Sequence, residues 1–131
     1  GQTEFATLVI PVTNVQDLLH DADVFVTINQ QKNALYFSRA VIPTIRGQQK
    51  KDWLQFGKFY KHMGLYAYTF DTLKAFANMA PGHLEMCESL EQLRWLENGG
   101  AIKIGITTHE SKSVDTPEDL KRVRGFMAKR V

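Results

Sequence analysis

The sequence has one cysteine among its 131 residues, Cys87. A single cysteine excludes an internal disulfide and a metal cluster built from cysteines, and it is typical of a reducing compartment. No apolar run approaches the roughly 20 residues that a transmembrane helix requires. The opening residues also contain no basic stretch leading into a hydrophobic one. These absences predict a cytoplasmic protein with no membrane segment.

Several well-known catalytic motifs are missing too. The sequence has neither a G-x-S-x-G nucleophile elbow nor a G-x-G-x-x-G loop, so it gives no sign of a hydrolase or a dinucleotide-binding enzyme of those kinds. Its four histidines follow no metal-ligand spacing, and we expect no Cys/His pairing. Cys87 falls on the apolar side of a predicted helix, which favours a position in the core.

The composition is that of an ordinary globular domain, with 44% hydrophobic and 23% charged residues and a net charge of +2. The length suits one domain or a fragment of one. The last eleven positions carry five basic residues and no acid. Such a tail is compatible with nucleic-acid binding, but cations also suit a helix C-terminus, and we expect a solvated helix and no nucleic acid.

Hydrophobic periodicity predicts alternating strands and helices, and therefore an α/β or α+β fold. Strands are expected at residues 5–12, 23–28, 34–38, 59–68 and 101–107, and helices at 15–20, 70–79, 84–98 and from 117 onward. Residues 43–57 form a long polar connection. In the helix over 84–98 the expected buried stripe is Met86, Cys87, Leu90, Leu93 and Leu96, with Glu85, Glu88, Gln92 and Trp95 opposite.

The predicted strand at residues 59–68 has two contrasting faces. Alternation puts Met63, Leu65 and Ala67 on one face, which we interpret as core. The other face carries rings around Gly64. His62 and Tyr66 lie on that face, roughly 13 Å apart along an ideal strand, and are suited to lining one elongated polar ligand. An amphipathic strand with stacked aromatic side chains is the alternative.

Three further polar side chains are candidates for chemistry. Asp115 directly precedes a Thr-Pro helix start, where a carboxylate suits Mg²⁺ binding, or simply a helix N-terminus. Glu88 and Gln92 are four residues apart and are expected to point the same way on one helix.

Four segments in order resemble 3-deoxy-manno-octulosonate (Kdo) cytidylyltransferases, the CMP-Kdo synthetase family. They are ALYFSRA at 34–40 followed by Ile42 and Pro43, KHMGLYAY at 61–68, LEMCESLEQLR at 84–94 and VDTPEDL at 114–120. The opening FATL at 5–8 also looks like the family's Met-Ala-Thr-Leu strand. The resemblance covers essentially the whole chain.

The resemblance implies a bacterial enzyme of lipopolysaccharide biosynthesis that couples Kdo to CMP from CTP, with Mg²⁺, and releases pyrophosphate. The implied fold is a nucleotide-diphospho-sugar transferase-like α/β sandwich, with a mixed sheet and flanking helices, and the implied assembly is a homodimer.

By the family pattern, six side chains would line one cleft. Arg39 would contact the sugar acid, since a guanidinium pairs with a carboxylate through two hydrogen bonds. His62, Tyr66, Glu88 and Gln92 fall on sugar-binding positions, with Glu91 as an alternative in the helix register. Asp115 falls on an aspartate that helps to hold Mg²⁺.

The chain resembles only the C-terminal half of such an enzyme. Nothing in it resembles the Gly- and Arg-containing loop for the CTP phosphates or the family's other metal-binding aspartate. We therefore expect the sugar-acid-binding and dimerisation half without its N-terminal partner, inactive alone. The alternatives are a cytidylyltransferase for another sugar acid, such as sialic acid or 8-amino-Kdo, and a non-catalytic dimerisation module.

Overall fold

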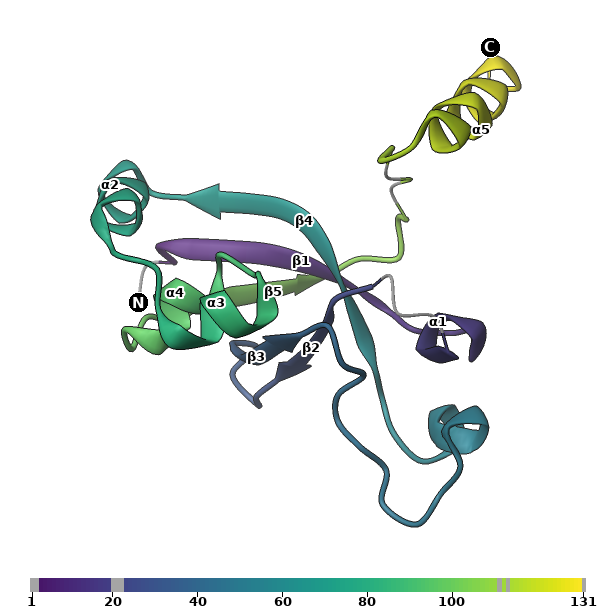
Figure 1. The fold of residues 1–131 in the computed structure, drawn as a ribbon, viewed down its shortest axis with the longest axis horizontal. Helices are drawn as coiled ribbons and strands as arrows, with labels where there is room; N and C mark the ends of the chain where they lie inside the picture. Colours follow the sequence, from purple (N-terminus) through teal and green to yellow (C-terminus); the bar gives the residue numbers. More distant parts are fainter. Residues whose placement is uncertain (1–2, 20–22, 111, 113, 131) are drawn as a thin grey trace.

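A computed structural model describes residues 3–19, 23–110, 112 and 114–130, and its strands form one mixed five-stranded sheet in the order β3-β2-β4-β1-β5 (Figure 1). The strands are β1 (Phe5–Pro11), β2 (Phe25–Ile28), β3 (Ala34–Ser38), β4 (Tyr60–Tyr68) and β5 (Lys103–Ile106). β5 runs parallel to β1, and the other pairs are antiparallel. The mixed sheet confirms the predicted α/β class.

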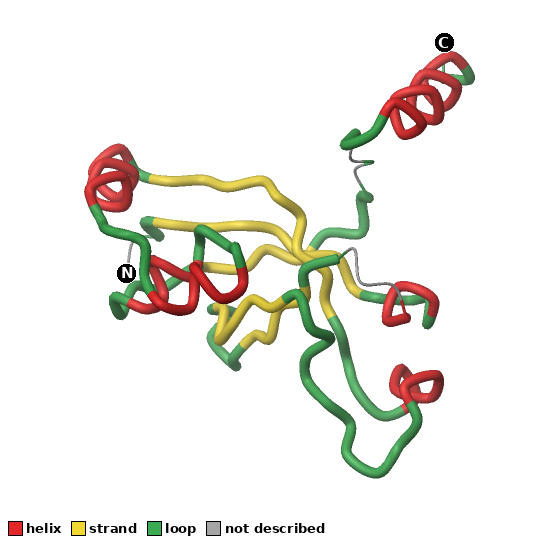
Figure 2. The backbone as a smooth tube through the Cα atoms, in the orientation of Figure 1, coloured by secondary structure: helices red, strands yellow, loops and turns green. Residues whose placement is uncertain are grey.

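Helical segments connect or flank the strands in the described part of the chain (Figure 2). They are α1 (Gln16–Leu19), the 3₁₀ helix η1 (Lys50–Gln55), α2 (Phe70–Asn78), α3 (His83–Glu88), α4 (Leu93–Glu97) and α5 (Pro117–Ala128). Thr69 caps α2 by accepting a hydrogen bond from the Thr72 amide. No helix in the described part of the chain is long and apolar enough to cross a membrane.

The two edges of the sheet meet. At the start of β3, the Ala34 amide donates to the Ile102 carbonyl over 2.9 Å, and the Ile104 amide donates to the Lys32 carbonyl over 2.8 Å. The sheet therefore curls until its first and last strands touch. We call the side of the sheet that carries Phe5 and Val9 the covered face, because the α3–α4 segment packs against it.

The main core lies between the covered face and the α3–α4 segment. Its buried members are Phe5, Val9, Val26, Ala34, Phe37, Leu90, Leu93, Ile102 and Ile104. The ring of Phe5 stacks on Tyr68, with centroids 4.4 Å apart, and meets Trp95 edge-on. Aromatic side chains thus join the β1–β4 pair to α4.

The single helix predicted over residues 84–98 is wrong, because two short helices replace it. Ser89 has φ 53° and ψ 48°, a left-handed conformation that ends α3. α4 then begins after Gln92 and is followed by Gly99 at φ 83°, the expected glycine terminus. The predicted stripe is accordingly also wrong in part: Met86 is 70% exposed and Cys87 is exposed.

The face of β4 assigned to the core is wrong as well. Leu65 is 59% exposed, whereas Tyr66 and Tyr68 pack against the main core. The reason is that α3 and α4 cover the ring-bearing face. A β-bulge accompanies this arrangement: Thr7 pairs with Tyr66 but Leu8 pairs with Met63, which leaves two residues of β4 without partners on β1.

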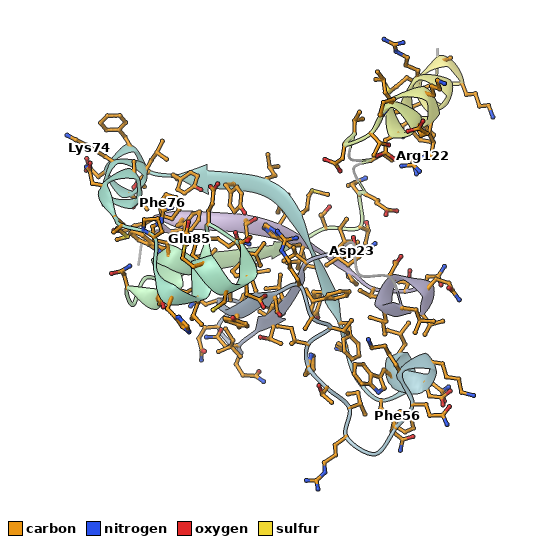
Figure 3. All side chains as sticks on the ribbon, viewed as in Figure 1. Asp23, Phe56, Lys74, Phe76, Glu85 and Arg122 are labelled. Carbon is orange, nitrogen blue, oxygen red and sulfur yellow. The ribbon has the colours of Figure 1, made fainter. Side chains whose placement is uncertain are left out.

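The long connection at residues 43–57 is folded. It contains η1, whose Trp53 is buried in a second core cluster and stacks on Phe59 with centroids 5.8 Å apart. Figure 1 shows this segment extending from the sheet, and Figure 3 places Phe56 in it, away from the sheet. Phe56 is 56% exposed.

α5 forms as predicted and is a solvated helix. Thr116 and Asp119 complete a capping box, and Pro117 occupies the first turn. None of its residues is buried, and Met127 is 56% exposed. In Figure 1 the helix stands apart from the sheet.

Candidate sugar-acid site

Arg39 and Glu88 lie together at the end of α3. The Arg39 amide donates to Glu88 Oε2 over 2.8 Å, and the Arg39 guanidinium donates to the carbonyls of Glu88 and Ser89 over 2.6 and 3.0 Å. These bonds satisfy carbonyls that a helix end leaves unpaired. Two of the five guanidinium N–H groups are used, so donors remain for a ligand.

His62 and Tyr66 are in contact on β4, which corrects the 13 Å separation expected of a regular strand. Their ring centroids are 5.4 Å apart, because the bulge at this point draws the two residues together. The His62 ring also meets Phe37 edge-on at 5.1 Å. Phe37 lies on β3, two residues before Arg39, and β2 separates β3 from β4 in the sheet, so the contact between Phe37 and His62 crosses β2.

Burial determines the charge state of both rings. It lowers the pKa of His62 from 6.5 to about 4, so the imidazole is neutral at pH 7. Burial also raises the pKa of Tyr66 to about 12, helped by the neighbouring Tyr68 and Glu91, so the phenol keeps its proton. Both side chains are therefore neutral hydrogen-bonding groups at neutral pH.

Gln92 is the least satisfied side chain in this region. It is 4% exposed, and its Nε2 is buried with no hydrogen-bond partner among the described residues. Leaving such a donor unpaired costs about 1–3 kcal/mol. Glu88 and Gln92 belong to different helical segments, so the expectation that they share one helix face is wrong; the turn at Ser89 sets their positions instead.

Asp115 is not brought to this group. It is exposed, and its amide donates to Asp119 Oδ2 over 3.3 Å at the start of α5. In Figure 1, α5 lies apart from α3 and α4. Within residues 3–19, 23–110, 112 and 114–130, no three His, Cys, Asp or Glu side chains form a group able to hold a metal. The role predicted for Asp115 in holding Mg²⁺ stays a prediction.

A family model named cytidylyltransferase matches residues 1–121. The chain belongs to the cytidylyltransferase family. This match covers the segments on which the resemblance rested, from the first strand to the beginning of α5.

Similar curated cytidylyltransferases share nearly half of their aligned residues with this chain. The 3-deoxy-manno-octulosonate cytidylyltransferase of Parabacteroides distasonis is 46% identical over 134 residues, which cover 99% of this chain and 53% of that protein. The protein of the same name from Bacteroides thetaiotaomicron is 47% identical over 131 residues, 98% of this chain and 52% of its own length. An 8-amino-3,8-dideoxy-manno-octulosonate cytidylyltransferase of Shewanella sp. strain ANA-3 is 43% identical over 128 residues, 98% of this chain and 50% of that protein.

A solved structure agrees in fold. The structure of CMP:2-keto-3-deoxy-manno-octonic acid synthetase complexed with CTP superposes with a TM-score of 0.87 at 32% identity, over 98% of this chain and 51% of that chain. This neighbour confirms the predicted nucleotide-diphospho-sugar transferase fold. The chain spans about half the length of the curated relatives it matches, their C-terminal half.

Three features of this cytidylyltransferase chain were missed in the sequence. Thr7 Oγ1 lies 2.9 Å from His62 Nε2, and alternation along the first strand could have indicated its inward position. Arg94 binds the Glu85 carboxylate through two hydrogen bonds of 2.6 and 2.7 Å, with both side chains largely buried.

The third feature is a contact between histidine and cysteine. Cys87 Sγ lies 3.7 Å from His83 Nε2 on the exposed side of α3, so the expectation of a core cysteine is wrong. The i, i+4 spacing of the two residues indicates this contact once α3 is a helix.

Proposed function

We propose that this chain is the sugar-acid-binding part of a 3-deoxy-manno-octulosonate cytidylyltransferase, which couples Kdo to CMP from CTP with release of pyrophosphate for lipopolysaccharide synthesis in the cytoplasm. The names of the curated relatives support this substrate. So do the contact of Arg39 with Glu88, the contact of His62 with Tyr66 and the buried amide of Gln92.

The buried Gln92 amide is the observation that carries the proposal. A donor without a partner loses its hydration and gains nothing until an acceptor arrives. A sugar acid supplies acceptors in its carboxylate and hydroxyl oxygens. The remaining N–H groups of Arg39 offer the matching cation, because guanidinium binds carboxylate through paired, charge-assisted hydrogen bonds.

The other side chains suit the polyhydroxylated part of the same ligand. His62 and Tyr66 are neutral at pH 7, so each offers hydrogen bonds without adding charge. Glu88 keeps one carboxylate oxygen, Oε1, beside the Oε2 that accepts from Arg39. In this arrangement Arg39 neutralises the ligand's carboxylate, while His62, Tyr66, Glu88 and Gln92 orient its hydroxyl groups.

The described residues do not fit a complete magnesium site. Mg²⁺ takes one or two carboxylates together with water and phosphate oxygens, and Asp115 offers one such carboxylate. In the proposed whole enzyme, Asp115 contributes one ligand, and the rest of the set and the CTP site come from the other half.

Kdo binding by the isolated chain tests the proposal by titration calorimetry. We expect saturable binding of Kdo, with an affinity at least tenfold lower in Gln92→Leu. The unfolding free energy of that variant is expected to rise by about 1 kcal/mol, because the unpaired donor is gone. Gln30→Leu, at an exposed position, is the matched control. Wild-type affinity in Gln92→Leu would contradict the proposal.

Catalysis gives a second test. The chain alone, mixed with Kdo, CTP and Mg²⁺, is expected to release no pyrophosphate, since nothing in it resembles the phosphate-binding loop. Pyrophosphate release by the pure 131-residue chain would overturn that expectation. Competition between Kdo, 8-amino-Kdo and sialic acid then tests the choice of sugar acid.

The proposal includes a homodimer. The extension at residues 43–57 presents Phe56 with 56% of its surface exposed, a large apolar side chain suited to burial against a second copy. Sedimentation velocity over a concentration series is expected to show a dimer that Phe56→Asp dissociates. A concentration-independent monomer would exclude this interface, and a dimer without Kdo binding would favour the dimerisation module.

A further inference from the structure

The hydroxyl of Thr7 lies at the centre of the β4 bulge. Thr7 is 2% exposed, and its Oγ1 has three polar neighbours: His62 Nε2 at 2.9 Å, the Leu65 carbonyl at 2.9 Å and the Met63 carbonyl at 3.3 Å. The bulge brings both carbonyls to one hydroxyl, because Thr7 pairs with Tyr66 and the next residue already pairs with Met63.

The hydrogen bonds of the Thr7 hydroxyl determine which ring nitrogen of His62 carries a proton. A threonine hydroxyl has one proton to donate and two lone pairs that accept. A carbonyl oxygen cannot donate, so the Thr7 proton is needed by Leu65, the nearer of the two carbonyls. The 2.9 Å contact with His62 is then a hydrogen bond only if Nε2 carries a proton and donates it to Thr7 Oγ1.

We propose that Thr7 is a positioning residue of the sugar-acid site, which holds His62 as the Nε2–H tautomer so that Nδ1 accepts a hydrogen bond from a ligand hydroxyl. The inference rests on the proposed function for the identity of that ligand. The tautomer itself follows from the contacts of Thr7 and is measurable without any ligand.

The surroundings of the ring support a fixed acceptor. Phe37 meets His62 edge-on with centroids 5.1 Å apart, and Tyr66 lies 5.4 Å away, so the imidazole is held between two aromatic side chains. No second hydrogen bond to the ring occurs within the described part of the chain, and Nδ1 keeps its lone pair. Burial disfavours the imidazolium, in which both nitrogens would be donors.

Nitrogen-15 NMR of chain labelled at histidine tests the assignment. At pH 7.5 we expect His62 to show a protonated Nε2 with slow solvent exchange and an unprotonated Nδ1. Thr7→Ser keeps the hydroxyl and is expected to retain both signals. Thr7→Val removes the acceptor and is expected to give mixed tautomers and fast exchange at Nε2, whereas Thr27→Val on β2 serves as the matched control.

Two outcomes would overturn the tautomer assignment. The first is a proton on Nδ1 in the wild-type chain, which needs no variant to fold. The second is a Thr7→Val variant whose His62 signals match those of the wild type.

Kdo titration of the same samples separates this inference from the proposed function. We expect Thr7→Val to raise the Kd for Kdo by about tenfold, as for the loss of one well-oriented hydrogen bond, and Thr7→Ser to restore it. If the wild type shows the expected tautomer but binds no Kdo, the proposed function fails while the hydrogen-bonded pair stands. If Kdo binds equally to Thr7→Val and wild type, the positioning role is wrong.

Discussion

The helices of the α3–α4 segment and α5 are stabilised in different ways, the former by packing and the latter by capping. α3 and α4 are six and five residues long, and neither has a side-chain N-cap, yet Glu85, Leu90, Gln92 and Leu93 are buried in this segment. α5 is twelve residues long with a complete capping box, and none of its residues is buried. Figure 3 shows the contrast: Glu85 lies among the side chains of the core, and Arg122 lies far from them.

The difference in burial between α3–α4 and α5 shows that a helix can form without contributing to the candidate site. Isolated helices as short as α3 and α4 are unstable in water, so packing on the sheet must hold them. That packing also positions Arg39, Glu88 and Gln92. α5 obtains its helical conformation from local bonds and contributes no buried side chain.

The largest expected effect comes from the ion pair inside the α3–α4 segment. Arg94→Ala leaves Glu85 without its two charge-assisted bonds in a largely buried position, and we expect a loss of about 2–4 kcal/mol of unfolding free energy. Urea denaturation measures it. Arg122→Ala removes the exposed pair with Asp119 in α5 and is the control. Equal effects of the two substitutions would show that the α3–α4 segment is not held by this pair.

As the pH falls, we expect the stability contributed by the covered face to decrease before that of α5. The pKa of His62 is about 4 in the folded chain and 6.5 when unfolded, so the unfolded chain binds more protons between these values. Stability is full above pH 6.5 and falls by about 3 kcal/mol as the pH drops to 4. Thermal denaturation from pH 7 to 4.5 measures this, and His62→Gln should flatten the profile. The pKa of Glu85 is lowered by its bonds to Arg94, so its contribution is lost only at lower pH.

Substitutions of one glycine beside α3 and one in α5 are expected to have smaller effects on stability, of opposite sign. A Cβ at Gly82 would collide with the carboxylate of Glu97, which accepts from the Leu84 amide at the start of α3. Gly82→Ala is therefore expected to cost about 1 kcal/mol, the usual loss of a helix cap. Gly125 in α5 has open space around its Cβ position, so Gly125→Ala is expected to stabilise by up to about 1 kcal/mol. Denaturant midpoints of both variants check the opposite signs.

The smallest effect is expected from removing α5 altogether. A chain that ends at residue 115 loses a helix with no buried residue, so its unfolding midpoint should equal that of the full chain. The near-ultraviolet circular dichroism of the buried Trp53 and the partly buried tyrosines provides the readout. A clear drop in the midpoint would mean that α5 supports the sheet.

The elements that local signals specify were predictable. The strand at residues 34–38 and the capped start of α5 appear as expected, because apolar alternation and the Thr-Pro-Glu-Asp sequence act over a few residues. The break between α3 and α4 at Ser89 was not predictable. A serine in the left-handed conformation has no sequence signal of its own and depends on how the α3–α4 segment packs.

The sequence could name candidate residues for the site but could not predict their geometry. Family motifs pointed to Arg39, His62, Tyr66, Glu88 and Gln92, and the structure shows contacts of Arg39 with Glu88 and of His62 with Tyr66. Their geometry was beyond periodicity, because a bulge shortens the distance from His62 to Tyr66 and a turn separates Glu88 from Gln92. Long-range packing sets both features, and a regular strand or helix template contains neither.

The meeting of β3 with β5 has a consequence for the behaviour of the chain in solution. Free sheet edges are templates on which other chains add strands and aggregate. Here the start of β3 and the residues around β5 bond to one another, and Lys103 Nζ donates to the Gln31 carbonyl over 2.7 Å beside them. Each edge therefore protects the other from intermolecular pairing, so the chain should resist fibril formation as long as the loop that leads into β3 stays bound to β5.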